Sequence, residues 1–119
     1  MALCRALVRD PEHEGVQVLA LHADGRAMGS ATIYWTWSTL SASRTAVMND
    51  LFVDPAFRGT AVAEALIDAC ATRARQHGAT SLGWQTAPDN LRAQAVYERI
   101  GARREEWVDY ALDTAAGRA

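Results

Sequence analysis

Cysteine is scarce in this chain of 119 residues, which contains Cys4 and Cys70 and no other. The two are far apart in the sequence and match none of the spacings that bind zinc or perform thiol redox chemistry. The three histidines, His13, His22 and His77, also lack a metal-ligand spacing. The sequence therefore predicts a fold without disulfides, no bound metal, and a reducing, cytoplasmic setting.

An excess of basic residues is also missing. The formal net charge is -2 and the isoelectric point is about 5.9, with basic residues scattered or interleaved with acidic ones. Because this distribution has no electrostatic footprint for DNA or RNA, a nucleic-acid partner is not expected. No apolar run approaches the roughly 18 residues that a membrane span requires, and the N-terminus has no apolar core of signal-peptide length. A membrane partner is therefore not expected either.

Strand patterns fill the first half of the chain. Three β-rich runs predict strands over residues 16–22, 28–37 and 45–53. The first two flank Asp24-Gly25, which is a strong turn signal, so we expect them to pair as an antiparallel hairpin. The third run ends at Asp54-Pro55.

Helix patterns alternate with strand patterns in the second half. The helical period runs over residues 60–77, ended by Gly78, and again from the N-cap Asn90 to Gly101. Strands are predicted over residues 81–86 and 103–112, the latter with Val108, Tyr110 and Leu112 facing inward. Residues 1–119 are thus predicted to form a single α/β domain, a sheet with helices packed on it.

One junction predicts a binding site. Residues 47–63 read as a buried strand that passes through one turn into a helix opening with Arg58, Gly59 and small residues. This arrangement aims free backbone N–H groups and the positive helix end at one point, which suits a diphosphate. The signal is weak alone, because many turns use glycine and many helices use alanine, so an ordinary structural turn is the alternative.

A second motif makes the interpretation more specific. Residues 90–102 read Asn-Leu-Arg-Ala-Gln-Ala-Val-Tyr-Glu-Arg-Ile-Gly-Ala. Together with the first motif, this segment resembles the GCN5-related N-acetyltransferase (GNAT) superfamily, which has an Arg/Gln-x-x-Gly-x-Gly/Ala loop and a later Asn-x-x-Ala-x-x-x-Tyr helix. The resemblance covers residues 47–112 and implies a mixed, mainly antiparallel sheet. Since about 15 residues precede the hairpin, we expect an N-terminally shortened member that lacks the usual first strand and two helices.

The resemblance implies that acetyl-CoA is the acetyl donor. It assigns the diphosphate to the backbone amides of Arg58, Gly59, Thr60, Ala61, Val62 and Ala63, and the pantetheine arm to the strand edges of Leu51, Phe52 and Val53. Ala61 stands where the pattern has its central glycine, and its methyl group would force the loop outward if that residue needs a positive φ. Asn90 matches an asparagine near the coenzyme, with a plain N-cap as the alternative role.

Two residues are the predicted catalytic groups. Tyr97 matches the family tyrosine that hydrogen-bonds or protonates the departing thiolate; a core tyrosine is the alternative. Asp50 is the candidate base for the acceptor amine, which must lose a proton before it attacks; a structural carboxylate is the alternative. The flanking segments look closest to the spermidine/spermine and diamine acetyltransferases, in which the residue matching Asn49 is usually acidic. Because adjacent strand residues face opposite sides, Asp50 is not expected to replace Asn49 directly.

The leading functional hypothesis is an N-acetyltransferase that acts on a primary amine of a small, polyamine-like molecule by direct attack. The alternative is a non-catalytic or partner-completed GNAT-like module that binds coenzyme A or a protein. An uncovered hairpin edge along residues 16–21 would favour a homodimer or a strand-exchanged dimer.

Overall fold

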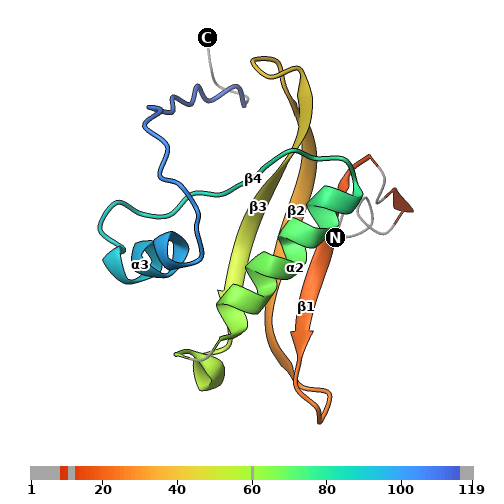
Figure 1. Ribbon diagram of the computed structural model, residues 1–119, viewed down its shortest axis with the longest axis vertical. Helices are drawn as coiled ribbons and strands as arrows, with labels where there is room; N and C mark the ends of the chain where they lie inside the picture. Colours follow the sequence, from red (N-terminus) through yellow and green to blue (C-terminus); the bar gives the residue numbers. More distant parts are fainter. Residues whose placement is uncertain (1–8, 11–12, 60, 116–119) are drawn as a thin grey trace. The chain divides into compact units, whose positions relative to one another are not determined.

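The computed structural model describes residues 9–10, 13–59 and 61–115, and the chain divides into two compact units, Met1–Pro88 and Asp89–Ala119. The first unit contains a four-stranded sheet in the order β1-β2-β3-β4, formed by Gly15–Leu21, Ala27–Ser38, Ser43–Val53 and Leu82–Gly83. It also contains the short 3-10 helix η1, Pro55–Phe57, and the helix α2, Val62–Gln76 (Figure 1). The second unit contains the helix α3, Leu91–Arg99.

The sheet is mixed and mainly antiparallel, which confirms the predicted fold class. Strand β1 pairs antiparallel with β2, β2 pairs antiparallel with β3, and β3 pairs parallel with β4. The turn between β1 and β2 contains the predicted Asp24-Gly25 pair. Gly25 has a φ of 91°, a conformation that glycine adopts without steric cost, and the Asp24 carboxylate accepts a hydrogen bond from the Arg26 amide at 3.0 Å.

One face of the sheet, which we call the inner face, packs against α2 (Figure 1). Strand alternation places one set of β2 and β3 side chains on this face, where they are buried: Ala31, Ile33, Trp35, Ala46 and Met48. The helical period brings a matching set from α2: Val62, Leu66, Ile67, Cys70 and Ala74. These two sets form the core, and the outer face of the sheet is the one away from α2.

Two details of the core concern residues considered for chemistry. Burial raises the pKa of the Cys70 thiol to about 11, so this cysteine acts as a small apolar core residue. The imidazole of His77, at the C-cap of α2, stacks on Trp35 with ring centroids 3.9 Å apart and an interplanar angle of 8°. Both side chains therefore contribute to packing.

The predicted strand over residues 81–86 is much shorter in the structure. Strand β4 consists of Leu82–Gly83, which pair with Ala46 and Val47 of β3. The prediction was right about the location and wrong about the length. We attribute the early end to a bulge in β3 just beyond this point, because a bulge bends its strand and interrupts regular pairing.

The predicted strand over residues 103–112 was wrong. The structure has no helix or strand between residues 102 and 115, and Val108, Tyr110 and Leu112 are 76%, 94% and 68% exposed rather than inward. The alternation of apolar residues shows which side chains would share a face, but a strand also needs a neighbouring edge to satisfy its backbone groups. Within the described residues, no strand pairs with this segment.

Helix α3 begins as predicted. The side-chain oxygen of Asn90 accepts a hydrogen bond from the Ala93 amide at 3.2 Å, which confirms Asn90 as the N-cap. Arg104 donates a hydrogen bond to the Gln94 side chain and lies 3.7 Å from the Glu98 carboxylate, so the chain after α3 starts against the helix. Among the helices that the structure describes, none is long and apolar enough to cross a membrane.

Candidate functional site

The most unusual backbone feature of the first unit is a bulge in β3. Ser30 pairs with Phe52, and the next aligned pair is Thr32 with Asn49, so Asp50 and Leu51 together face Ala31. Asp50 has a φ of 54°, in the left-handed region that residues other than glycine seldom adopt. Left-handed bulge positions are usually glycine, and a strained residue in such a position is a reason to look for a function.

The bulge reverses the alternation of β3. Before it, Ala46 and Met48 are buried on the inner face; after it, Leu51 and Val53 are the more shielded residues. Asn49 and Asp50 are both exposed, and the extra residue of the bulge interrupts the simple alternation on which the prediction about their two sides was based. Neither side chain makes a hydrogen bond to the described part of the chain. The bulge therefore presents an amide and a carboxylate next to each other, both available to a ligand.

The bulge coincides with an open edge of the sheet. Pairing between β3 and β4 stops at Val47 and Gly83, so residues 48–53 have β2 on one side and no described strand on the other. This edge includes Leu51, Phe52 and Val53, the three residues predicted to hold the pantetheine arm. An edge of this kind offers backbone N–H and C=O groups at strand spacing, so an extended, amide-containing ligand fits it.

A tight turn connects this edge to α2. The Asp54 carboxylate accepts a hydrogen bond from the Ala56 amide at 2.9 Å and begins η1. The Arg58 side chain donates through Nε to the Val53 carbonyl at 3.3 Å, which ties the turn to the end of β3. Gly59 has a φ of 81°, and a Cβ there would meet nothing within 4 Å, so the conformation rather than crowding requires glycine. Thr60 lies outside the described residues.

The N-terminus of α2 is the predicted diphosphate position. Ala61 is its N-cap residue, with a φ of -81° and no side-chain hydrogen bond to the helix. Ala61 therefore needs no positive φ, and its methyl group causes no conformational strain. Val62 is buried against the sheet and Ala63 is half-buried. Because the cap residue offers no side-chain acceptor to the first-turn N–H groups, these groups and the positive helix end can take an anion.

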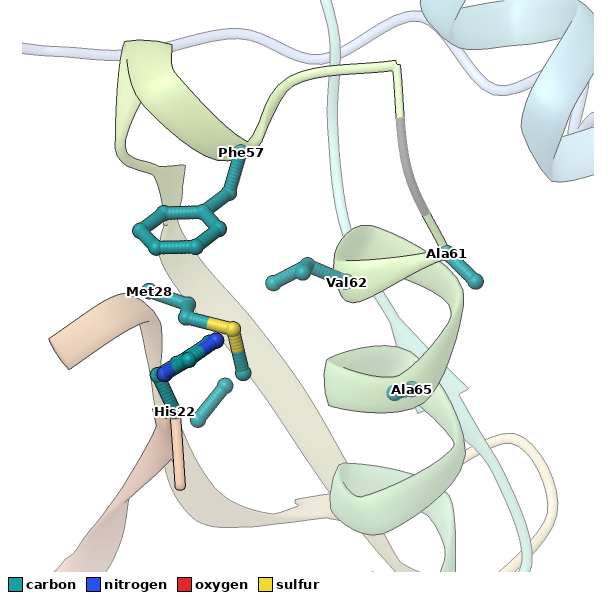
Figure 2. Close-up of a pocket in the computed structure, with 7 residues that line it drawn as sticks. His22, Met28, Phe57, Ala61, Val62 and Ala65 are labelled. Atoms are coloured by element: carbon teal, nitrogen blue, oxygen red, sulfur yellow. The ribbon is translucent and has the colours of Figure 1, made fainter. Parts of the chain in front are cut away.

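A hollow of about 420 Å³ lies beside this helix end (Figure 2). It is lined by residues of β1, β2, η1 and the start of α2, together with His22 just after β1: Ala20, His22, Met28, Phe57, Ala61, Val62 and Ala65. The Arg26 guanidinium lies 5.5 Å from the ring centroid of Phe57, one of the lining residues. The lining is almost entirely apolar, so the hollow offers packing surface, whereas the groups suited to acyl chemistry lie at the bulge.

The remaining predicted residues, Asn90 and Tyr97, belong to the second unit. Asn90 is exposed and uses its side-chain oxygen as the N-cap of α3. Tyr97 is half-buried on α3. The structure thus brings together the site residues of β3, the turn and α2, while the roles of Asn90 and Tyr97 beyond α3 stay predictions. The described residues contain no group of three or more His, Cys, Asp or Glu that could hold a metal ion.

Comparisons with known proteins show the family of this chain. The model of the acetyltransferase (GNAT) family matches residues 3–102. An uncharacterized N-acetyltransferase, YhfO, of Bacillus subtilis (strain 168) is 34% identical over 105 residues, covering 87% of this chain and 70% of that protein.

Solved structures give the same result. A probable acetyltransferase superposes with a TM-score of 0.81 at 33% identity, covering 96% of this chain and 75% of its own. An aminoglycoside acetyltransferase, HMB0005, from an uncultured soil metagenomic sample has a TM-score of 0.72 at 25% identity, covering 86% and 67%. These relatives favour an enzyme over a non-catalytic module.

Proposed function

This chain belongs to the acetyltransferase (GNAT) family and is an acetyltransferase, and from that premise we propose that it transfers an acetyl group from acetyl-CoA to a primary amine of a small molecule. One observation carries the proposal: the open edge of β3, with its strained bulge at Asp50, leads through a tight turn to the N-terminus of α2. A ligand that combines an extended amide arm with a diphosphate fits this path.

The donor is held by backbone groups more than by side chains. In this proposal the pantetheine arm lies along Leu51, Phe52 and Val53, and the diphosphate lies against the turn and first residues of α2. Acetyl-CoA supplies the thioester that is to be cleaved. A backbone amide near Phe52 stabilises the negative charge that develops on the thioester oxygen.

The reaction is a direct transfer between two substrates. The amine nitrogen forms a bond to the thioester carbonyl carbon, and the carbon–sulfur bond then breaks. An ammonium group has no lone pair at neutral pH, so the amine must first lose a proton. The exposed Asp50 carboxylate accepts that proton directly or through a water molecule.

Tyr97 assists the other end of the reaction, as the family pattern implies. A phenol has an ordinary pKa of about 10 and a thiol one of about 8.5, so full proton transfer is uphill by roughly 2 kcal/mol. Tyr97 therefore stabilises the departing thiolate by a hydrogen bond. A half-buried position on α3 is compatible with this role.

The acceptor is a small, polyamine-like amine. Support comes from the sequence resemblance to diamine acetyltransferases and from the likeness to an aminoglycoside acetyltransferase, because aminoglycosides are themselves rich in amino groups. We also propose a homodimer in which a second copy of the chain covers the unpaired edge of β1, the terminal strand of the sheet. A monomeric mass at micromolar concentration in light scattering would contradict the dimer.

Two measurements test the proposed function separately. Thermal unfolding with acetyl-CoA at about 100 times its Kd should show about 2.7 kcal/mol of added stability. Release of coenzyme A thiol with a panel of small amines should then be detected for the natural chain and fall about tenfold or more in Tyr97→Phe, with acetyl-CoA binding unchanged. No thermal shift at millimolar acetyl-CoA, or a shift without thiol release from any amine, would reject the proposal.

A further inference from the structure

The fold determines from which side an acceptor reaches the edge of β3. Helix α2 covers the inner face of the sheet, where its packing against β2 and β3 buries Ala31, Ile33 and Met48. The hollow beside its N-terminus has an almost entirely apolar lining, which offers few polar partners to an ammonium group. On the outer face, Leu19 of β1 and Phe52 of β3 are 60% and 51% exposed. An amine that attacks a thioester held along β3 therefore approaches across the outer face.

A row of polar side chains crosses that face and ends at the bulge. Strand register places Gln17 of β1 opposite Thr32 of β2, and Thr32 opposite Asn49 of β3. Residues directly opposite in antiparallel strands lie on the same face and within contact distance. On one side of it the register aligns Leu19, Ser30 and Phe52, and on the other side Gly15, Tyr34 and Val47.

The members of the row have different exposures. Thr32 is 4% exposed, whereas Gln17 and Asn49 are exposed. The Gln17 side chain donates through Nε2 to the Thr32 hydroxyl at 3.4 Å. The carbonyl oxygen of Gln17 makes no hydrogen bond within the described chain, so it can accept one from a ligand. Thr32 thus positions Gln17.

Hydrogen-bond acceptors stand at both ends of the row. Asn49 and Asp50 offer side-chain oxygens at the bulge, and Gln17 offers one at the far end. Neighbouring strands are about 4.8 Å apart, so two strand spacings separate Gln17 from Asn49 by about 10 Å. Acceptors at this separation suit a molecule that carries donors at its two ends.

We propose that this row, Gln17, Thr32 and Asn49, binds the acceptor substrate, and that the acceptor is an extended amine with a second hydrogen-bond donor group about 10 Å from the reacting nitrogen. The inference rests on the proposed acetyl transfer. Gln17 binds the distant donor group, Asn49 orients the amine beside Asp50, and Thr32 acts as a positioning residue through Gln17.

The competing explanation is structural. A cross-strand Gln–Thr hydrogen bond stabilises a sheet by itself, by up to about 1 kcal/mol. Stability measurements alone therefore do not separate the two roles. A dependence of Kd and KM on the length of the acceptor does separate them, because a purely structural hydrogen bond would not discriminate between ligands of different length.

The experiment uses α,ω-diamines from ethane-1,2-diamine to decane-1,10-diamine, each compared with the n-alkyl monoamine of the same length. Binding to the full chain loaded with coenzyme A is measured by calorimetry, and KM is measured by thiol release. The variants are Gln17→Leu, Thr32→Val and Thr32→Ser, with Thr36→Val as the matched control on the same face of β2. Thr36 is exposed and pairs with Thr45, outside the row.

For the natural chain we expect the Kd and KM of diamines to pass through a minimum at a length near the 10 Å span, with no such minimum for monoamines. Gln17→Leu should raise the KM of the best diamine about tenfold, as expected for a lost hydrogen bond to a charged group, and leave monoamines unchanged. Thr32→Val should act in the same direction, Thr32→Ser should restore the preference, and Thr36→Val should have no effect.

Two results would overturn the inference: turnover of diamines without a length preference, or an equal effect of Gln17→Leu on diamines and monoamines. Absence of thiol release with every amine would instead reject the proposed function. In that case calorimetry still tests whether the row binds the acceptor. Binding of diamines with a length preference that is lost in Gln17→Leu would support the inference, and absence of diamine binding would reject it.

Discussion

The two halves of β3 differ although they are continuous in sequence. Residues 43–47 are bordered by β2 on one side and by β4, or the segment just before it, on the other. Together with Met48, which follows them, they place Ala46 and Met48 in the core. Residues 49–53 have an open edge, a bulge and a left-handed aspartate. The first half satisfies its backbone groups and buries apolar surface, as stability requires. The second half has backbone groups without a strand partner on one side and buries less apolar surface. This is where the proposed donor and acceptor meet.

The largest expected effect comes from breaking the packed half. Met48 is 2% exposed, so Met48→Ala should lower the free energy of unfolding by about 3 kcal/mol, through lost burial and a residual cavity. Phe52→Ala, in the open half, should lower it by less than about 1 kcal/mol because its ring is half exposed. Urea unfolding monitored by tryptophan fluorescence measures both. Equal losses would mean that the two halves do not differ in their contribution to stability.

The open half should respond through activity. Asp50→Asn should reduce kcat about a hundredfold, or roughly 2.7 kcal/mol, because the amide does not accept the proton of the amine. Unfolding and acetyl-CoA binding should be unchanged, since the Asp50 side chain makes no hydrogen bond within the described chain. Asp68→Asn, an exposed aspartate on α2, is the matched control in steady-state kinetics. An unaltered kcat in Asp50→Asn would assign proton removal to solvent.

The same contrast explains what could be predicted from the sequence. The hairpin, the start of α3 and the period of α2 depend on local signals such as Asp24-Gly25 and the Asn90 cap, which act within a few residues. The bulge was missed because it depends on how two strands align. Two residues of β3 lie opposite the single residue Ala31 of β2, and no local sequence pattern indicates this extra residue. Gln17 and Thr32 were missed for the same reason, since their pairing is a matter of register.

Two other predictions show the limits of pattern comparison. Alternation over residues 103–112 indicated a shared face but contained no information about a partner edge, and the strand did not form. The family pattern placed a glycine at position 61, whereas the positive φ belongs to Gly59 and Ala61 has an ordinary conformation. The conformation of a turn is determined by the whole path of the chain. A positive φ at one position, here Gly59, can therefore remove the need for a positive φ at a neighbouring one, here Ala61.

The strain at the bulge can be measured with a pair of substitutions. Asp50 has a φ of 54°, which glycine tolerates best and alanine least. The free energy of unfolding of Asp50→Gly should therefore be about 1 kcal/mol higher than that of Asp50→Ala. Both variants lack the carboxylate, so both should lose activity to the same extent. Chemical denaturation of the two variants gives the difference. If alanine is as stable as glycine, the bulge is relaxed and its conformation is no sign of a functional constraint.

The smallest effects are expected in the turn that joins the open half of β3 to α2, where two neighbouring positions provide a matched test. Gly59→Ala should cost about 1 kcal/mol of stability, because its φ of 81° is unfavourable for alanine even though the added Cβ has free space. It should also weaken acetyl-CoA binding, since the turn leads into the proposed diphosphate position. Ala61→Gly should cost no more than a few tenths of a kcal/mol and leave the Kd for acetyl-CoA within about twofold, because a φ of -81° suits both residues. Calorimetric titration of both variants decides the matter: tighter binding in Ala61→Gly would mean that the methyl group keeps the diphosphate away from the helix end after all.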